Sequence, residues 1–122
     1  MEKKEKIVYI LTYGAEDPER ATFPFTLAAG ALTMDVDTTI VLQGSAVFLA
    51  KKGFIEHVSA CGMNPLKDLL SSFLEMGGKI LVCQPCINER KIKPEDLIEG
   101  ARSTGAAEVT KEILEAQATL VY

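Results

Sequence analysis

The sequence has no tryptophan, a single histidine and only three cysteines among 122 residues. One histidine excludes metal sites built on several imidazoles. No apolar run approaches the roughly 18 residues of a membrane-spanning helix, which argues against a membrane partner. Residues 1–6 carry mixed charge, whereas a secretory signal needs an apolar stretch of about 7–15 residues. Together with the odd cysteine count, this predicts a cytoplasmic protein with free thiols.

Concentrated positive charge is also missing. Acidic residues outnumber basic ones 17 to 13, for a net charge of -4, and no basic cluster exists to bind nucleic-acid phosphates. Gly14 and Gly44 belong to neither of the glycine-rich phosphate motifs, so we expect no nucleotide or flavin cofactor. The acids Glu16, Asp17 and Glu19 are interpreted as favouring a helix start rather than as metal ligands.

What the sequence does have is a regular alternation of strand and helix signals. Apolar residues make up 48% of the chain, enough for a core in one domain spanning 1–122. Apolar, β-branched runs predict buried strands at 6–12, 38–42, 79–83 and 118–122, and a brief strand at 107–109. Between them we expect helices at 17–34, 45–52, 64–76, 85–90, 94–100 and 110–117, with Asp17, Ser45, Asn64 and Thr110 as their caps.

This order predicts an α/β fold, in which right-handed crossovers produce a mostly parallel sheet covered on both faces. The expected architecture is a single-domain three-layer sandwich with a five-stranded sheet, flavodoxin-like or Rossmann-like. Functional sites in such folds lie at the carboxyl ends of the strands. Loops 13–15, 43–45 and 83–86 should meet there, so we expect Tyr13, Gly14, Gly44 and Ser45 to line a pocket.

Cys83 is the strongest candidate for chemistry because it ends a strand and precedes a helix that Pro85 can start. Backbone N–H groups at that helix start should favour a thiolate and lower the pKa of Cys83 below about 8.5. A thiolate can take up a sulfane sulfur as a persulfide and surrender it to another thiol. The alternative interpretation is a buried cysteine that only packs.

Cys86 completes a CxxC motif with Cys83, and its role has two interpretations. It is either a resolving thiol that closes a disulfide with Cys83 or a small packed residue. Cys61 and His57 could join the pair in a zinc site with three cysteines and one histidine. A single CxxC is weak support for zinc, so no metal is expected.

The chain resembles the DsrE/DsrF/TusD-like sulfur-relay superfamily over almost its whole length. The pieces that carry the resemblance are Thr12-Tyr13-Gly14, Asp17-Pro18-Glu19-Arg20-Ala21, Gly44-Ser45-Ala46-Val47, Val82-Cys83-x-x-Cys86 and Ile92-x-Pro94-Glu95-Asp96-Leu97-Ile98-Glu99-Gly100. The resemblance implies a homo-oligomer, typically a trimer or hexamer. It also implies that Cys83 carries sulfur and exchanges it with a small TusA-like carrier protein.

Two other functions remain open at this point. One is a non-enzymatic oligomeric binding or scaffold protein with inert thiols. The other is a dithiol redox protein that cycles a Cys83–Cys86 disulfide. The sequence leaves open whether the chain is a sulfurtransferase enzyme or a carrier.

Overall fold

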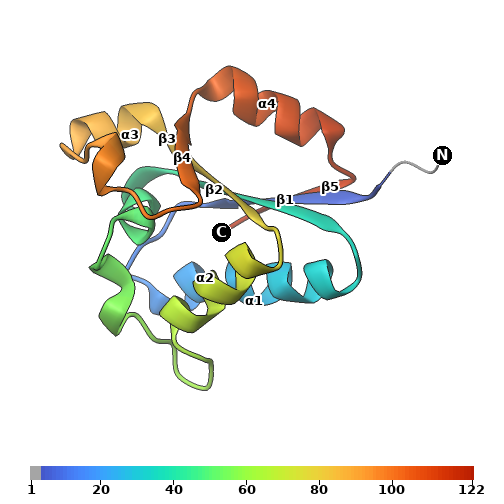
Figure 1. Cartoon of the computed structure of the whole chain (residues 1–122), viewed down its shortest axis with the longest axis horizontal. Helices are drawn as coiled ribbons and strands as arrows, with labels where there is room; N and C mark the ends of the chain where they lie inside the picture. The colour runs from blue at the N-terminus through green and yellow to red at the C-terminus, as the bar shows by residue number, and fades with distance from the viewer. Residues whose placement is uncertain (1–3) are drawn as a thin grey trace.

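Every strand in the sheet pairs in parallel in the computed structural model, which describes residues 4–122 (Figure 1). The five strands lie in the order β4-β3-β2-β1-β5. They are β1 (Lys6–Leu11), β2 (Asp37–Leu42), β3 (Lys79–Cys83), β4 (Ala101–Thr104) and β5 (Ala118–Val121). The predicted α/β fold with a five-stranded parallel sheet is therefore confirmed. The predicted charged start at 1–6 lies partly outside the described residues.

Helices cover both faces of the sheet. α1 (Pro18–Thr33) and α2 (Leu66–Glu75) lie on one face, and α4 (Ala106–Glu115) lies on the other (Figure 1). The short α3 (Gln84–Glu89) follows β3 directly. The described residues also contain three 3₁₀ turns: η1 (Gly44–Ala50), η2 (Phe54–His57) and η3 (Pro94–Asp96). None of the helices in residues 4–122 has the length and apolar character needed to cross a membrane.

The predicted start of α1 is confirmed in detail. Asp17 is the N-cap, its side chain accepts the backbone N–H of Arg20 at 3.1 Å, and Pro18 opens the helix. Pro has no N–H to lose at this position, and its fixed φ already suits a helix. This cap fixes where the chain leaves the carboxyl end of β1.

Several predicted elements are wrong in position. The fourth strand is Ala101–Thr104 rather than 107–109, and α4 begins at Ala106 instead of after Thr110. β4 has the sequence Ala-Arg-Ser-Thr, so it lacks the continuous apolar run by which the other strands were found. The predicted helix at 94–100 is only the turn η3.

Two predicted caps are also wrong, and one irregular segment has structure. Ser45 lies inside η1, which Gln43 precedes, and makes no cap hydrogen bond. Pro65 rather than Asn64 flanks the start of α2. The segment after Lys52, where no helix or strand is predicted, contains η2.

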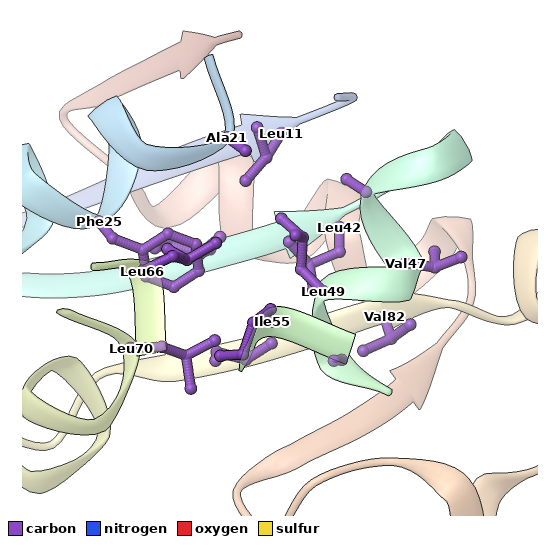
Figure 2. Close-up of a cluster of buried hydrophobic side chains, with 14 of the residues drawn as sticks. Leu11, Ala21, Phe25, Leu42, Val47, Leu49, Ile55, Leu66, Leu70 and Val82 are labelled. Atoms are coloured by element: carbon purple, nitrogen blue, oxygen red, sulfur yellow. The ribbon is translucent and has the colours of Figure 1, made fainter. Parts of the chain in front are cut away.

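The main core lies between the sheet and the α1/α2 layer (Figure 2). Phe25 of α1 and Phe73 of α2 meet edge to face with ring centroids 5.7 Å apart, and both are fully buried. On the opposite face, the only fully buried apolar side chains of the described core are Val8, Val41 and Leu81. The α4 face is therefore much more thinly packed than the α1/α2 face.

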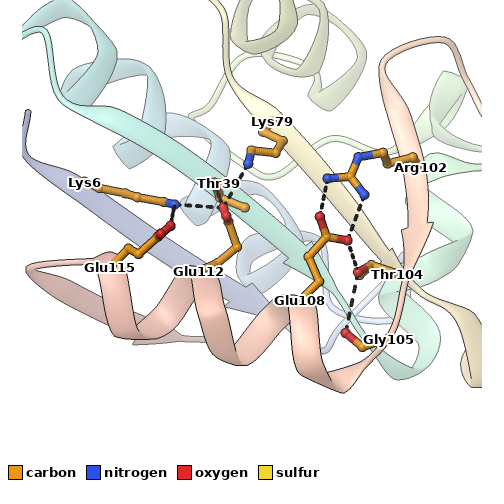
Figure 3. A network of polar contacts seen from close by, with 9 residues as sticks. All are labelled: Lys6, Thr39, Lys79, Arg102, Thr104, Gly105, Glu108, Glu112 and Glu115. Carbon is orange, nitrogen blue, oxygen red and sulfur yellow. Dashed lines mark hydrogen bonds and ion pairs between the residues drawn. The ribbon is translucent and has the colours of Figure 1, made fainter.

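An ionic cluster supplements this thin packing under α4 (Figure 3). Glu112 is buried, with its side chain 7% exposed. Its carboxylate makes three contacts. It lies 3.0 Å from the Lys6 ammonium and 3.1 Å from the Lys79 ammonium, and it accepts the Thr39 hydroxyl at 2.9 Å. Burial by itself raises the pKa of Glu112, but these three donors outweigh it and hold the pKa below the ordinary 4.5. The cluster therefore ties α4 to β1, β2 and β3.

Replacing Glu112 by Gln should destabilise the fold by about 1–3 kcal/mol at pH 7, because the substitution leaves the Lys6 and Lys79 charges without their shared buried partner. The pKa of Glu112 is lower in the folded chain than in the unfolded chain. Its stabilisation is therefore fully present above about pH 4.3 and is lost as the pH falls through the lower folded value. Urea unfolding at pH 7 and at pH 3 should show that the difference in free energy of unfolding between wild type and Glu112→Gln is smaller at pH 3.

Glu115→Gln is the matched control, because Glu115 pairs with the same Lys6 at 3.4 Å but is 46% exposed. It should change the free energy of unfolding by less than about 0.5 kcal/mol. If both variants lost the same free energy of unfolding, burial of Glu112 would not be the reason that the cluster stabilises the fold.

Candidate functional site

Cys83 and Cys86 lie together at the carboxyl end of β3. Cys83 is the last residue of the strand and flanks α3, and Cys86 lies in the first turn of that helix. Both thiols are free and half-buried, and their sulfur atoms are 2.6 Å apart. A disulfide bond is about 2.05 Å long, so only a small side-chain movement separates the two thiols from a disulfide. The structure thus brings both predicted cysteines into one pair.

Gly44 connects the loop after β2 to this pair. Its backbone N–H donates to the Cys86 sulfur at 3.3 Å. The φ angle of Gly44 is +56°, in the left-handed region that glycine adopts without strain. This turn points the Gly44 N–H at the Cys86 sulfur, so the conformation of Gly44 helps to position the thiol pair.

Glu16 clamps the loop after β1 to the loop after β2. One of its carboxylate oxygens accepts the Gly14 N–H at 3.0 Å, and the other accepts the Ser45 hydroxyl. The Ser45 hydroxyl chiefly lowers the pKa of Glu16. A Cβ on Gly14 would lie 2.7 Å from the Ser45 carbonyl oxygen, so only glycine fits there. The clamp holds the segment that presents the Gly44 N–H.

Sequence reasoning missed Glu16, because it interpreted the acids at 16–19 together as helix-start residues. Asp17 alone caps α1, which leaves Glu16 free for another role. Tyr13, the remaining predicted residue of this loop, lies under the guanidinium of Arg20, 4.8 Å from the ring centroid. Tyr13 therefore braces the first turn of α1.

A pocket of about 310 Å³ opens beside Cys83, between the end of β3 and the start of α4. Its wall is formed by Val41, Gln43, Cys83, Pro85, Thr104, Gly105, Ala106, Val109 and Thr110. None of these side chains is charged, and most of the surface is apolar. Tyr13, Gly14, Gly44 and Ser45, predicted as pocket residues, lie outside this wall. The volume suits a small molecule or the tip of a partner's side chain.

The start of α4, which forms one side of the pocket, is held by charged and polar contacts (Figure 3). The Arg102 guanidinium of β4 pairs with the Glu108 carboxylate, which also accepts the Thr104 hydroxyl. The guanidinium, with help from Thr104, lowers the pKa of Glu108 to about 2. The ion pair therefore persists at any physiological pH and fixes the first turn of α4 against β4.

The predicted lowering of the Cys83 pKa is wrong. Burial and the neighbouring Cys86 raise the pKa of Cys83, and they outweigh the backbone N–H of Cys86 and the positive charge of Arg90. α3 has only six residues, so its dipole cannot compensate for the removal of the thiolate from water. Negative charge on Cys86 adds to the rise in the Cys83 pKa by Coulomb repulsion.

The zinc set considered from the sequence is not assembled in residues 4–122. Cys61 and His57 are both exposed, in the segment that precedes α2. No group of three or more histidine, cysteine, aspartate or glutamate side chains converges in this described part of the chain.

Arg90→Gln should slow alkylation of Cys83 roughly two- to fivefold at pH 7, because loss of the positive charge raises the Cys83 pKa further and lowers the thiolate fraction. Iodoacetamide rates measured from pH 6 to 10, with peptide mapping by mass spectrometry, would show the midpoint moving to higher pH. Lys91→Gln removes an exposed neighbouring charge and should leave the profile unchanged. Identical profiles for Arg90→Gln and wild type would contradict a role for Arg90.

Comparison with known proteins identifies a family that the chain matches. The model of the DsrE/DsrF-like family matches residues 5–122. The uncharacterized protein MJ0989 of Methanocaldococcus jannaschii is 36% identical over 97 residues, covering 80% of this chain and 82% of that protein. The uncharacterized protein MJ0760 of the same organism is 34% identical over 104 residues, covering 85% of this chain but only 38% of that protein.

Solved structures share the fold at low sequence identity. The ychN protein from E. coli superposes with a TM-score of 0.81 at 19% identity, covering 97% of this chain and 99% of that one. MTH1491 from Methanobacterium thermoautotrophicum, a protein of unknown function, superposes with a TM-score of 0.77 at 13% identity, covering 98% of this chain and all of that one.

Proposed function

The chain belongs to the DsrE/DsrF-like family, and on that premise we propose that it accepts sulfane sulfur on Cys83 as a persulfide and passes it to a partner thiol. One observation carries the proposal: of the three cysteines, only Cys83 lies in the wall of the pocket at the carboxyl ends of the strands. An incoming sulfur compound that enters this pocket therefore meets the Cys83 sulfur.

The loading step needs no residue beyond a thiolate and a place for the leaving group. The Cys83 thiolate attacks the terminal sulfur of a donor persulfide, forming a new S–S bond. The donor's own S–S bond breaks, and its inner sulfur leaves as a thiolate that takes up a proton. The uncharged pocket suits a sulfur presented on a small or apolar group.

A raised pKa is compatible with this chemistry. It makes the Cys83 thiolate scarcer, but a thiolate of higher pKa is also the stronger nucleophile. The Arg90 charge and the Cys86 backbone N–H favour the thiolate that does form. We propose a small TusA-like carrier protein as the exchange partner.

Cys83→Ser should abolish sulfur loading while leaving the fold intact, because serine keeps the size of the side chain and removes the sulfur nucleophile. Intact-mass spectrometry after incubation with thiosulfate or polysulfide would follow mass gains in steps of about 32 Da. Cys61→Ser, at an exposed cysteine outside the pocket, should load as wild type does.

Other outcomes of this measurement would favour the other functions. Sulfur retained by Cys83→Ser would refute the proposed site. A disulfide that forms without any sulfur uptake and needs both Cys83 and Cys86 would favour dithiol redox chemistry, which the 2.6 Å contact supports. No mass change in any variant would favour a scaffold with inert thiols.

The proposed function includes assembly of several copies of the chain, three or six. The edge strand β5 supports this, because Leu120 is 40% and Val121 68% exposed at the end of the described sheet. An exposed apolar edge strand is normally protected by pairing or by cover from another chain. Two more exposed apolar residues, Phe23 and Leu27, lie on α1.

Val121→Lys should shift the oligomer towards monomer, because it places a charge on the exposed edge that would be buried between copies. Light scattering coupled to size-exclusion chromatography would measure the mass. Met76→Lys is the matched control, since Met76 is 41% exposed but lies at the end of α2, away from β5. A wild-type monomer would refute assembly altogether.

A further inference from the structure

Any sulfur loaded on Cys83 would have a second thiol as its neighbour. We propose that Cys86 discharges the Cys83 persulfide, releasing hydrogen sulfide and leaving a Cys83–Cys86 disulfide. This activity rests on the proposed loading of Cys83 and goes beyond it. The protein would then reduce sulfane sulfur to sulfide, in addition to exchanging it with a partner.

The geometry favours attack on the inner sulfur. In a Cys83 persulfide the inner sulfur is the Cys83 Sγ itself, and the Cys86 Sγ lies 2.6 Å from it. Cys83 forms part of the pocket wall, whereas Cys86 does not. The outer sulfur therefore has the pocket to occupy and to leave through, while Cys86 reaches the inner sulfur from outside that pocket.

The surroundings of Cys86 suit a nucleophile. The Gly44 N–H, which donates to the Cys86 sulfur at 3.3 Å, stabilises negative charge there and keeps the side chain in place. The Glu16 clamp on Ser45 holds the loop that carries this donor.

The step balances without any outside oxidant. The Cys86 thiol gives its proton to the outer sulfur and, as a thiolate, forms a bond to the Cys83 Sγ. The bond between that atom and the outer sulfur breaks, and the outer sulfur leaves as HS⁻. The sulfane sulfur gains two electrons and the two cysteine sulfurs lose them in forming the disulfide. Each further turnover needs an external dithiol, which reduces this disulfide by thiol–disulfide exchange.

The test uses fully reduced, full-length protein under anaerobic conditions with thiosulfate as donor. Thiosulfate that loads a thiolate leaves sulfite behind, so any sulfide detected comes from the protein-bound sulfur. Sulfide is measured with a selective electrode, and protein mass is followed in rapidly quenched samples. The variants are Cys86→Ser, Cys86→Ala as a second check on folding, and Cys61→Ser as the matched cysteine control.

Wild type and Cys61→Ser should release sulfide in step with sulfite and end about 2 Da lighter, after a transient gain of about 32 Da. Both Cys86 variants should keep the gain of about 32 Da and release at least about tenfold less sulfide, since neither side chain can displace sulfur from the persulfide. Circular dichroism should show the same fold in all of them.

The failures of the two proposals are distinguishable. A wild-type protein that holds its added sulfur and releases no sulfide would overturn the discharge by Cys86 and leave Cys83 loading in place. Sulfide released equally by Cys86→Ser would also overturn it. If neither thiosulfate nor inorganic polysulfide adds mass to the Cys86 variants, the loading of Cys83 fails, and the discharge fails with it.

Discussion

Parallel pairing of β1, β2 and β3 is the constraint on which the site depends. In-register neighbours such as Leu11 beside Leu42, and Leu42 beside Val82, make the three strands end at one edge of the sheet. The loops that follow must then meet, and contacts from Glu16 to Ser45 and from Gly44 to Cys86 join them. Within the third of these segments, Cys86 contacts Cys83. A parallel sheet with crossover helices produces this convergence whatever the loops contain, and the residues of these loops turn it into a thiol site.

The sequence was sufficient to predict the parts of the fold that rest on continuous apolar runs and on capping. β3 was predicted at 79–83, as observed, and α1 begins at the Asp17-Pro18 signal. The strand β4 was misplaced because an edge strand of polar residues carries no such signal. Because of that error the pocket was not predicted, since the end of β4 and the start of α4 form much of its wall. The direction of the Cys83 pKa shift was predicted wrongly because it depends on burial and on the distance to Cys86, which only coordinates supply.

The two faces of the sheet are stabilised in different ways. The α1/α2 face is filled by large side chains such as Phe25 and Phe73, which lose dispersion contacts if they shift. The α4 face has few buried apolar residues and relies on charge pairs made by Glu108, in the first turn of the helix, and by Glu112, one turn later. The pocket beside Cys83 lies on this second face, where polar contacts rather than dense packing set the position of the helix.

In the proposed chemistry, competition between the Cys86 thiol and a partner's thiol would decide the fate of a sulfur atom loaded on Cys83. Cys86 is held in contact and acts with the high effective concentration of an intramolecular group, whereas a partner's thiol must first bind and reach the pocket. Transfer to a partner can then prevail only if its docking moves Cys86 away from Cys83 or breaks the Gly44 hydrogen bond that holds the Cys86 sulfur. The loop clamped by Glu16 is thus the element through which a partner could choose between sulfur transfer and sulfide release.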